Sequence, residues 1–145
     1  MVSSINKSCE ETVLDYIVAT IDPTMVSASY ISGVGNVEEL QAPCVFVSVL
    51  DGNEVVYNSN VYELFTTVST KEMASDVATG SLGVLAQQVQ QCFWDPNRET
   101  KLNQTGSWNF VTYQAQNLNV RHSVTADAMI NELLIRIVGT VSGSN

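Results

Sequence analysis

The chain has 145 residues, of which 45% are hydrophobic and only 14% are charged. This composition is typical of a folded globular domain, and it excludes an intrinsically disordered chain. Fifteen acidic residues against six basic ones give a net charge of -9. Because the basic residues do not cluster, the charge disfavours stable binding to nucleic acid, although DNA could still pass such a surface without sticking to it.

The N-terminal region and the apolar runs give no sign of membrane targeting. No window approaches the run of about 20 apolar residues that a membrane-spanning helix needs. Glu10, Glu11 and Asp15 interrupt any apolar core of a signal peptide. We therefore expect no membrane partner and synthesis in a cytoplasm.

The residues that most often carry chemistry are few and scattered. Cys9, Cys44 and Cys92 form no C-x-x-C pair, so we expect buried thiols and neither a disulfide framework nor a zinc site. The single histidine, His122, is expected in a solvated loop. We find no catalytic constellation, metal site or cofactor motif, and the sequence predicts a protein that is not an enzyme.

A helix is predicted over residues 9–21. Ser8 and Glu11 have the spacing of a capping box, which would place residues 1–7 in a flexible end. The acidic residues of this helix are expected on its solvated face. Four apolar residues recur at helical spacing: Leu14, Ile17, Val18 and Ile21.

The next segment, residues 24–41, reads as a short strand over 26–31 and then a long exposed loop. Loops of this length in compact domains are more often functional than accidental. Glu38 and Glu39 lie in this loop and are candidates for a functional position.

A β-hairpin is predicted to follow. Residues 44–50 have high β-propensity and are apolar at both odd and even positions, so both faces of a strand would be apolar. Asp51-Gly52-Asn53 has the composition of a hairpin turn. Asp51 and Glu54 are thus further candidates for a protruding docking loop. The return strand covers residues 61–69, with Tyr62, Leu64, Thr66 and Val68 on one face.

A second helix is expected to begin near Ser75 and to end by Asp95-Pro96. Its apolar stripe consists of Leu82, Leu85, Val89 and either Cys92 or Phe93.

Two strands complete the pattern, over residues 108–114 and 129–141, with His122 in the loop between them. In the last strand Met129, Asn131, Leu133, Ile135 and Ile137 share one face. The other face is also apolar, so it needs a second covering surface, which could be another subunit. We therefore predict a subunit interface on that face: Ile130, Glu132, Leu134, Arg136 and Val138.

The element order predicts an α+β fold in a single domain, with a further flexible end at residues 142–145. The order and several segments resemble the tail terminator (tail completion) proteins and related neck proteins of tailed bacteriophages. The likeness covers residues 8–141. Its segments are E-E-T-V-L-D-Y-I-V from Glu10, P-C-V-F-V-S-V from Pro43, Y-E-L-F-T-T-V-S from Tyr62, L-A-Q-Q-V-Q-Q-C-F from Leu85, and L-L-I-R-I-V from Leu133.

This resemblance implies a mostly antiparallel sheet of four to five strands with two helices packed on one face. It also implies a virion protein at the neck, assembled in the host cytoplasm as a six-membered ring. Such a ring would cap the tail tube, dock to the head connector and leave a channel for transient passage of genomic DNA. Glu38 and Glu39 would then be candidates for a docking or channel-lining position.

Three alternatives stay open. The chain could be another neck, connector or minor tail protein. It could be a small α+β enzyme or ligand-binding domain with a pocket between sheet and helices. It could also be a host adaptor that binds a protein along an edge strand.

Overall fold

The computed structural model describes residues 2–21, 29–33, 40, 43–55, 61–73, 84–97, 108–122 and 128–141. The helices and strands are α1 (Val2–Thr20), β1 (Ser29–Ser32), β2 (Cys44–Glu54), β3 (Val61–Met73), α2 (Val84–Trp94), β4 (Trp108–His122) and β5 (Ala128–Val141).

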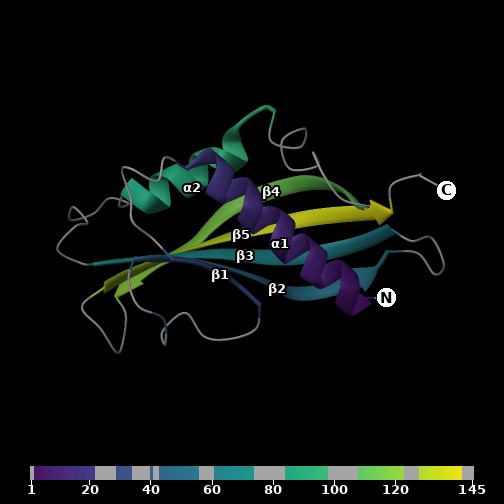
Figure 1. Ribbon diagram of the computed structural model, residues 1–145, viewed down its shortest axis with the longest axis horizontal. Coiled ribbons are helices and arrows are strands. Elements are labelled where there is room, and N and C mark those ends of the chain that lie inside the picture. The colour runs from purple at the N-terminus through teal and green to yellow at the C-terminus, as the bar shows by residue number, and fades with distance from the viewer. Residues whose placement is uncertain are drawn as a thin grey trace.

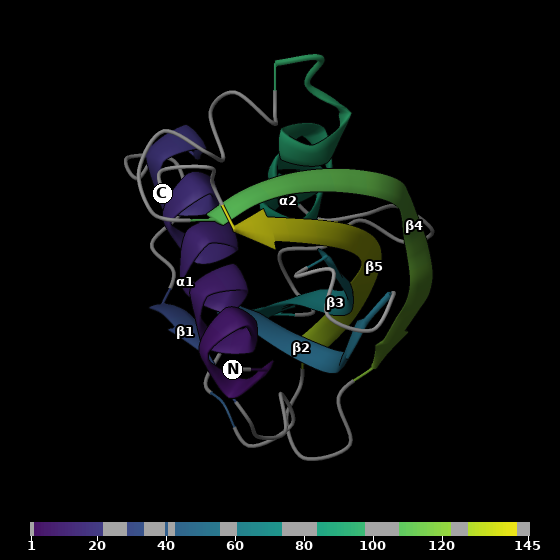
Figure 2. The ribbon, with the colours of Figure 1, turned by 90° about the vertical axis from the view of Figure 1, so that its right-hand side faces the viewer.

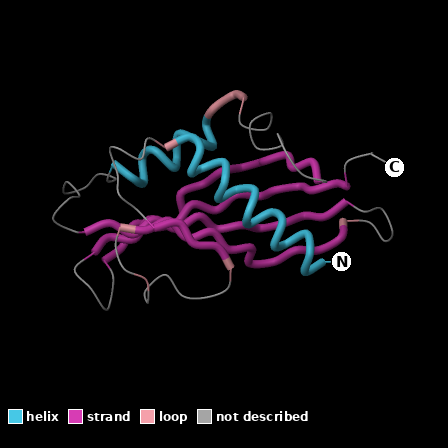
Figure 3. The backbone as a smooth tube through the Cα atoms, in the orientation of Figure 1, coloured by secondary structure: helices cyan, strands magenta, loops and turns pink. Residues whose placement is uncertain are grey.

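The described strands form one five-stranded sheet in the order β1-β2-β3-β5-β4 (Figure 1). All neighbours are antiparallel except β1, which pairs in parallel with the first four residues of β2. Both helices pack on the same face, with α1 running obliquely across the strands (Figure 3). The predicted α+β fold, with a mostly antiparallel sheet and helices on one side, is therefore confirmed.

The core lies between the helices and one face of the sheet. Alternate residues of β3 and β5 point into it, as period-2 geometry requires: Tyr62, Leu64, Thr66 and Val68, and Leu133, Ile135 and Ile137. The predicted division of both strands into two faces is thus confirmed. The opposite face carries neither described helix and is called the helix-free face below.

Helix α1 begins at Val2, seven residues before its predicted start. Ile5, Cys9, Val13 and Ile17 recur every four residues and are fully buried in the core. Ser8 lies inside the helix, so the capping box predicted there is wrong, and residues 2–7, which were predicted to belong to a flexible end, are helical. The helix extends towards the N-terminus because burial of Ile5 against the sheet stabilises the added turns. The local capping pattern carries no information about this tertiary contact.

Strand β2 continues through the predicted hairpin turn. A β-bulge between Val49 and Asp51 leaves Leu50 63% exposed, and pairing with β3 resumes at Asp51 and runs to Glu54. The prediction that Asp51-Gly52-Asn53 forms a turn is therefore wrong. An Asp-Gly pair favours a turn locally, but here both residues pair with β3, opposite Phe65 and Leu64, and this pairing overrides the local preference.

A buried carboxylate of α1 stabilises this irregular part of β2. Glu10 is 8% exposed, and its Oε2 atom accepts a hydrogen bond from the Val49 backbone N–H at 2.8 Å. The predicted solvated position of Glu10 is wrong, because the pairing of β1 with β2 ends at Val47 and the Val49 N–H needs another acceptor.

Helix α2 presents the predicted stripe to the core, with Leu85, Val89, Cys92 and Phe93 all buried, and it ends at Trp94 as predicted. Its first turn is held by β3: Glu72 accepts hydrogen bonds from the N–H groups of Leu85 at 3.0 Å and Ala86 at 3.4 Å. A carboxylate there satisfies N–H groups that a helix cannot pair and complements the helix dipole. Ser75 and Leu82 lie outside the described residues.

Strand β4 is longer than predicted and reaches His122, so the predicted loop position of this histidine is wrong. Its register shifts twice against β5, between Tyr113 and Gln116 and between Asn117 and Asn119. Such bulges bend a strand, and β4 and β5 curve strongly along their length (Figure 2). Strand β5 matches its prediction to within one residue.

Candidate functional site

The helix-free face contains the residues predicted as a subunit interface. Strand pairing places Phe65 opposite Arg136, Thr67 opposite Leu134, and Glu63 opposite Val138. Phe65, Leu134 and Val138 keep partial exposure, whereas their counterparts on the helix side are buried. An apolar band across the two central strands is therefore left partly open to solvent by the described residues.

Two charged side chains on this face, Glu63 and Arg136, form an ion pair. Arg136 donates from Nε to Oε2 of Glu63 at 2.7 Å, and its Nη2 lies 2.6 Å from the same oxygen. The two side chains are 35% and 30% exposed. This pair is weaker than a fully buried one, yet it lowers the cost of covering the face because neither charge would be covered alone.

One end of the helix-free face is closed within the chain. Ile130 is fully buried and packs with Phe46 and Leu40. Beside it Lys71, 1% exposed, donates from Nζ to the Leu40 carbonyl at 2.7 Å. Ile130 cannot contact another subunit in this arrangement, so its assignment to the interface is corrected. Leu134, Val138, Glu132 and Arg136 stay partly exposed.

The docking residues predicted in loops have separate outcomes. Glu38 and Glu39 lie outside the described residues. Asp51 and Glu54 belong to β2, opposite Phe65 and Tyr62 of β3, rather than to a hairpin turn. Their assignment to a protruding loop is wrong, because the strand continues past the bulge to Glu54.

All three cysteines are buried and free, as predicted. Burial raises the pKa of the Cys9 thiol to about 12, although Thr66, whose Oγ1 lies 3.7 Å from the sulfur, opposes the shift. Burial also raises the pKa of Cys44, against the opposing charge of Lys71. Thiols held neutral in this way are poor nucleophiles.

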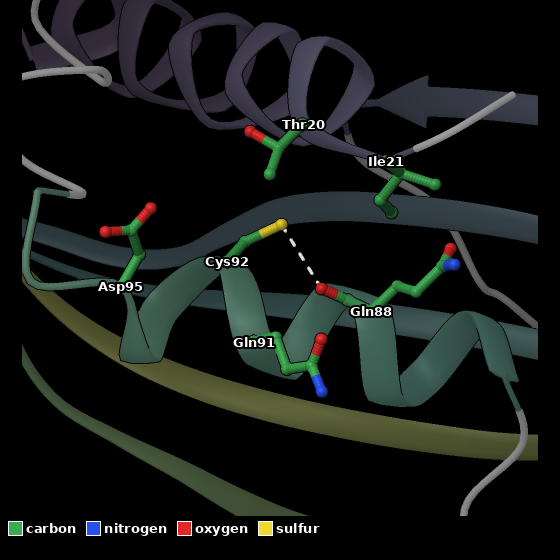
Figure 4. A pocket seen from close by; sticks show the side chains of 6 residues that line it. All are labelled: Thr20, Ile21, Gln88, Gln91, Cys92 and Asp95. Carbon is green, nitrogen blue, oxygen red and sulfur yellow. Dashed lines mark hydrogen bonds between the residues drawn. The ribbon is translucent and has the colours of Figure 1, made fainter.

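A pocket of about 330 Å³ lies on the helix side, between the C-terminal ends of α1 and α2. In Figure 4 the side chains of Thr20 and Ile21 come from the α1 end, and Cys92 and Asp95 lie across the gap from them. The Cys92 thiol donates to the Gln88 carbonyl at 3.3 Å. The lining residues are Thr20, Ile21, Gln88, Gln91, Cys92 and Asp95.

Sequence reasoning missed three polar residues with positioning roles: Glu10, Lys71 and Glu72. All three are buried and bond to backbone groups distant in sequence. The only signal in the sequence was a charged residue within or beside an apolar run, which is also the pattern of a solvated face.

Within the described part of the chain, no three His, Cys, Asp or Glu side chains gather as metal ligands would. Among the described helices, none combines the length and apolarity needed to cross a bilayer. No protein-family model matches the sequence, and a search of curated proteins gives no significant match.

Proposed function

We propose that this protein is a structural virion component of a tailed bacteriophage, of the tail terminator type. It forms a homohexameric ring that ends the tail tube, joins it to the head connector and lets genomic DNA pass. The proposal rests on the resemblance in element order and segments, together with the helix-free face.

The observation that carries self-assembly is the apolar band on the helix-free face. Phe65, Leu134 and Val138 lie on the two central strands, where a single-layered sheet would otherwise place polar side chains. Closed rings of identical subunits need only one repeated contact, and an apolar band beside the Glu63–Arg136 ion pair is suited to such a contact.

The acidic character of the chain agrees with a DNA channel. With a net charge of -9, an assembled ring of six would repel phosphates from its surface. A conduit of this kind lets DNA slide, whereas a basic lining would hold it by phosphate contacts.

The test is the assembly state of the wild type and of Leu134→Asp, by native mass spectrometry and negative-stain electron microscopy. We expect six-fold rings for the wild type and a folded monomer for the variant, because the aspartate would be an unpaired charge inside the contact. Val18→Asp is the matched control, since Val18 is 45% exposed on α1, on the helix side.

Rings that persist in Leu134→Asp would show that the helix-free face is not the contact. A wild type that stays monomeric at high concentration, alone and with tail tubes added as a template, would refute ring assembly.

The pocket between α1 and α2 favours a second candidate, a ligand-binding α+β domain. It lies between two helices rather than between sheet and helices. Saturable binding of a small molecule by a monomer would support this candidate over the ring.

A further inference from the structure

Helix α2 turns a surface to solvent that offers amide groups and an aromatic ring but no charge. None of its eleven residues is Asp, Glu, Lys or Arg. Gln87, Gln91 and Trp94 are exposed, and Trp94 is 52% exposed. The three follow each other at spacings of four and three residues, so they lie on one side of the helix. We call these three residues the glutamine face of α2.

The exposed side of α1 differs from this surface within the same chain. It carries Lys7, Glu11 and Asp15, and the Lys7 Nζ atom lies 4.0 Å from Oε1 of Glu11. Charged residues of this kind are typical of a helix face that stays in water. Charged residues are depleted in the buried centre of protein interfaces, whereas tryptophan is enriched there. Of the two described helices, α2 is therefore the one whose exposed side suits a protein contact.

The net charge of the chain favours this surface for a contact between two copies of the protein. At a net charge of -9, copies repel each other wherever their acidic side chains approach. The repulsion is smallest where one partner contributes no acidic side chain, and α2 is a helix without one.

A ring of identical subunits also requires two different surfaces on each subunit. In a head-to-tail contact, one surface of a subunit binds a different surface of the next subunit. The helix-free face supplies only one of these surfaces. Helix α2 packs on the other side of the sheet, so one subunit can use both surfaces at the same time, each for a different neighbour (Figure 1).

The two surfaces are chemically complementary. The Trp94 ring can pack against the apolar band that contains Leu134 and Val138. The carboxamide of Gln91 both donates and accepts hydrogen bonds. It therefore covers the surroundings of the Glu63–Arg136 ion pair with polar atoms and adds no further charge there.

We propose that the glutamine face of α2 in one copy binds the helix-free face of the next copy, head to tail. This inference rests on the proposed self-assembly, and it names the second surface of the repeated contact.

The test is cross-linking with a short bis-maleimide. Gln91→Cys places a thiol on the glutamine face, and Val138→Cys places one on the helix-free face. The native thiols of Cys9, Cys44 and Cys92 are buried, so the wild type is the control for background reaction. We expect cross-linked dimers from an equimolar mixture of the two variants and none from either variant alone. The variant with both substitutions should give a ladder of higher oligomers.

A charge placed on the glutamine face tests the same contact without cross-linking. Gln91→Glu keeps the shape of the side chain, and it should weaken assembly about tenfold because the carboxylate would be covered without a partner. Lys7→Gln changes the net charge by the same amount at the end of α1 that lies far from α2 (Figure 1), and it should leave assembly unchanged. Trp94→Ala should also weaken assembly about tenfold, and it serves as the second variant if Gln91→Glu does not fold. Analytical ultracentrifugation measures these changes.

Cross-links formed by Val138→Cys alone would show that two helix-free faces meet, which would overturn the proposal. Assembly that both Gln91→Glu and Trp94→Ala leave unchanged would overturn it as well. Rings that form without any cross-link in the mixture would reject this contact and leave the proposed function standing, whereas a wild type that never assembles would reject both.

Discussion

Gly139 of β5 is the position where one added methyl group should perturb the core most clearly. It lies directly opposite Phe110 of β4. A Cβ atom at Gly139 would lie 2.8 Å and 2.9 Å from two carbons of the Phe110 ring and 3.0 Å from Cδ1 of Ile5. The ring is 1% exposed and Ile5 is fully buried, so neither can move into solvent.

We expect Gly139→Ala to lower the free energy of unfolding by about 1–2 kcal/mol. Forcing an extra carbon into a packed core costs about 1–3 kcal/mol. Replacing glycine in a strand recovers about 0.5–1 kcal/mol, because alanine loses less backbone entropy on folding. For a chain of 145 residues the net loss corresponds to about 3 °C in Tm per kcal/mol.

Urea unfolding followed by circular dichroism measures this loss, and Phe110→Leu identifies its cause. In the Phe110→Leu background the ring is gone, so Gly139→Ala should cost at least about 1 kcal/mol less there than in the wild type. A Gly139→Ala variant as stable as the wild type would refute the steric argument. Additive losses in the double variant would show that the ring is not the obstacle.

Three further predictions concern buried polar groups and the helix-free face. Glu72→Ala should lower the free energy of unfolding, measured in urea, by about 1–3 kcal/mol, because two N–H groups of α2 lose their acceptor. The control Glu11→Ala, at an exposed position, should lower it by less than about 0.5 kcal/mol. Equal losses would contradict the capping role of Glu72. The unfolded Cys9 thiol has a pKa of 9.0 and the folded thiol a pKa of about 12. The part of the folding stability that depends on a neutral Cys9 thiol is therefore fully present below pH 9 and falls as the pH rises from 9 to 12. Relative to Cys9→Ala, the wild type should lose about 1.4 kcal/mol per pH unit between pH 9 and pH 12, and parallel curves would contradict a raised pKa. A double-mutant cycle replacing Glu63 and Arg136 with alanine should give a coupling of about 1 kcal/mol in the monomer, and zero coupling would mean that the ion pair contributes nothing to stability.

Periodicity predicted most of the fold, and its errors share a cause. The alternation in β3 and β5 and the stripe of α2 matched because burial on one face leaves a repeat in the sequence. The misplaced boundaries, at Ser8, Asp51 and His122, are points where local capping or turn signals competed with tertiary packing. A capping pattern or an Asp-Gly pair contributes about 1 kcal/mol, and burial of a large side chain such as Ile5 contributes more.

The sequence indicated candidate residues that share one strand, but it did not indicate features that form through contacts between distant segments. Leu134 and Val138 were predicted on the outer face because β5 is apolar on both of its faces, and both are partly exposed there, while their role in a subunit interface stays a prediction. Ile130 was assigned to the same surface, but in the structure it is buried because Leu40 packs against it. The pocket between α1 and α2 left no sequence signal, because Thr20 and Asp95 lie far apart in the sequence and meet through helix packing.

The sequence by itself determined the α+β class, the two-faced last strand, the buried cysteines and the acidic surface, since each follows from residue type and spacing along one segment. Only the tertiary structure decided that Glu10 and Glu72 are buried, that β2 passes through a bulge, and that two helix ends enclose a pocket. Those features depend on which backbone groups lack a partner once the sheet has formed, and that is a property of the assembled chain and not of any one segment.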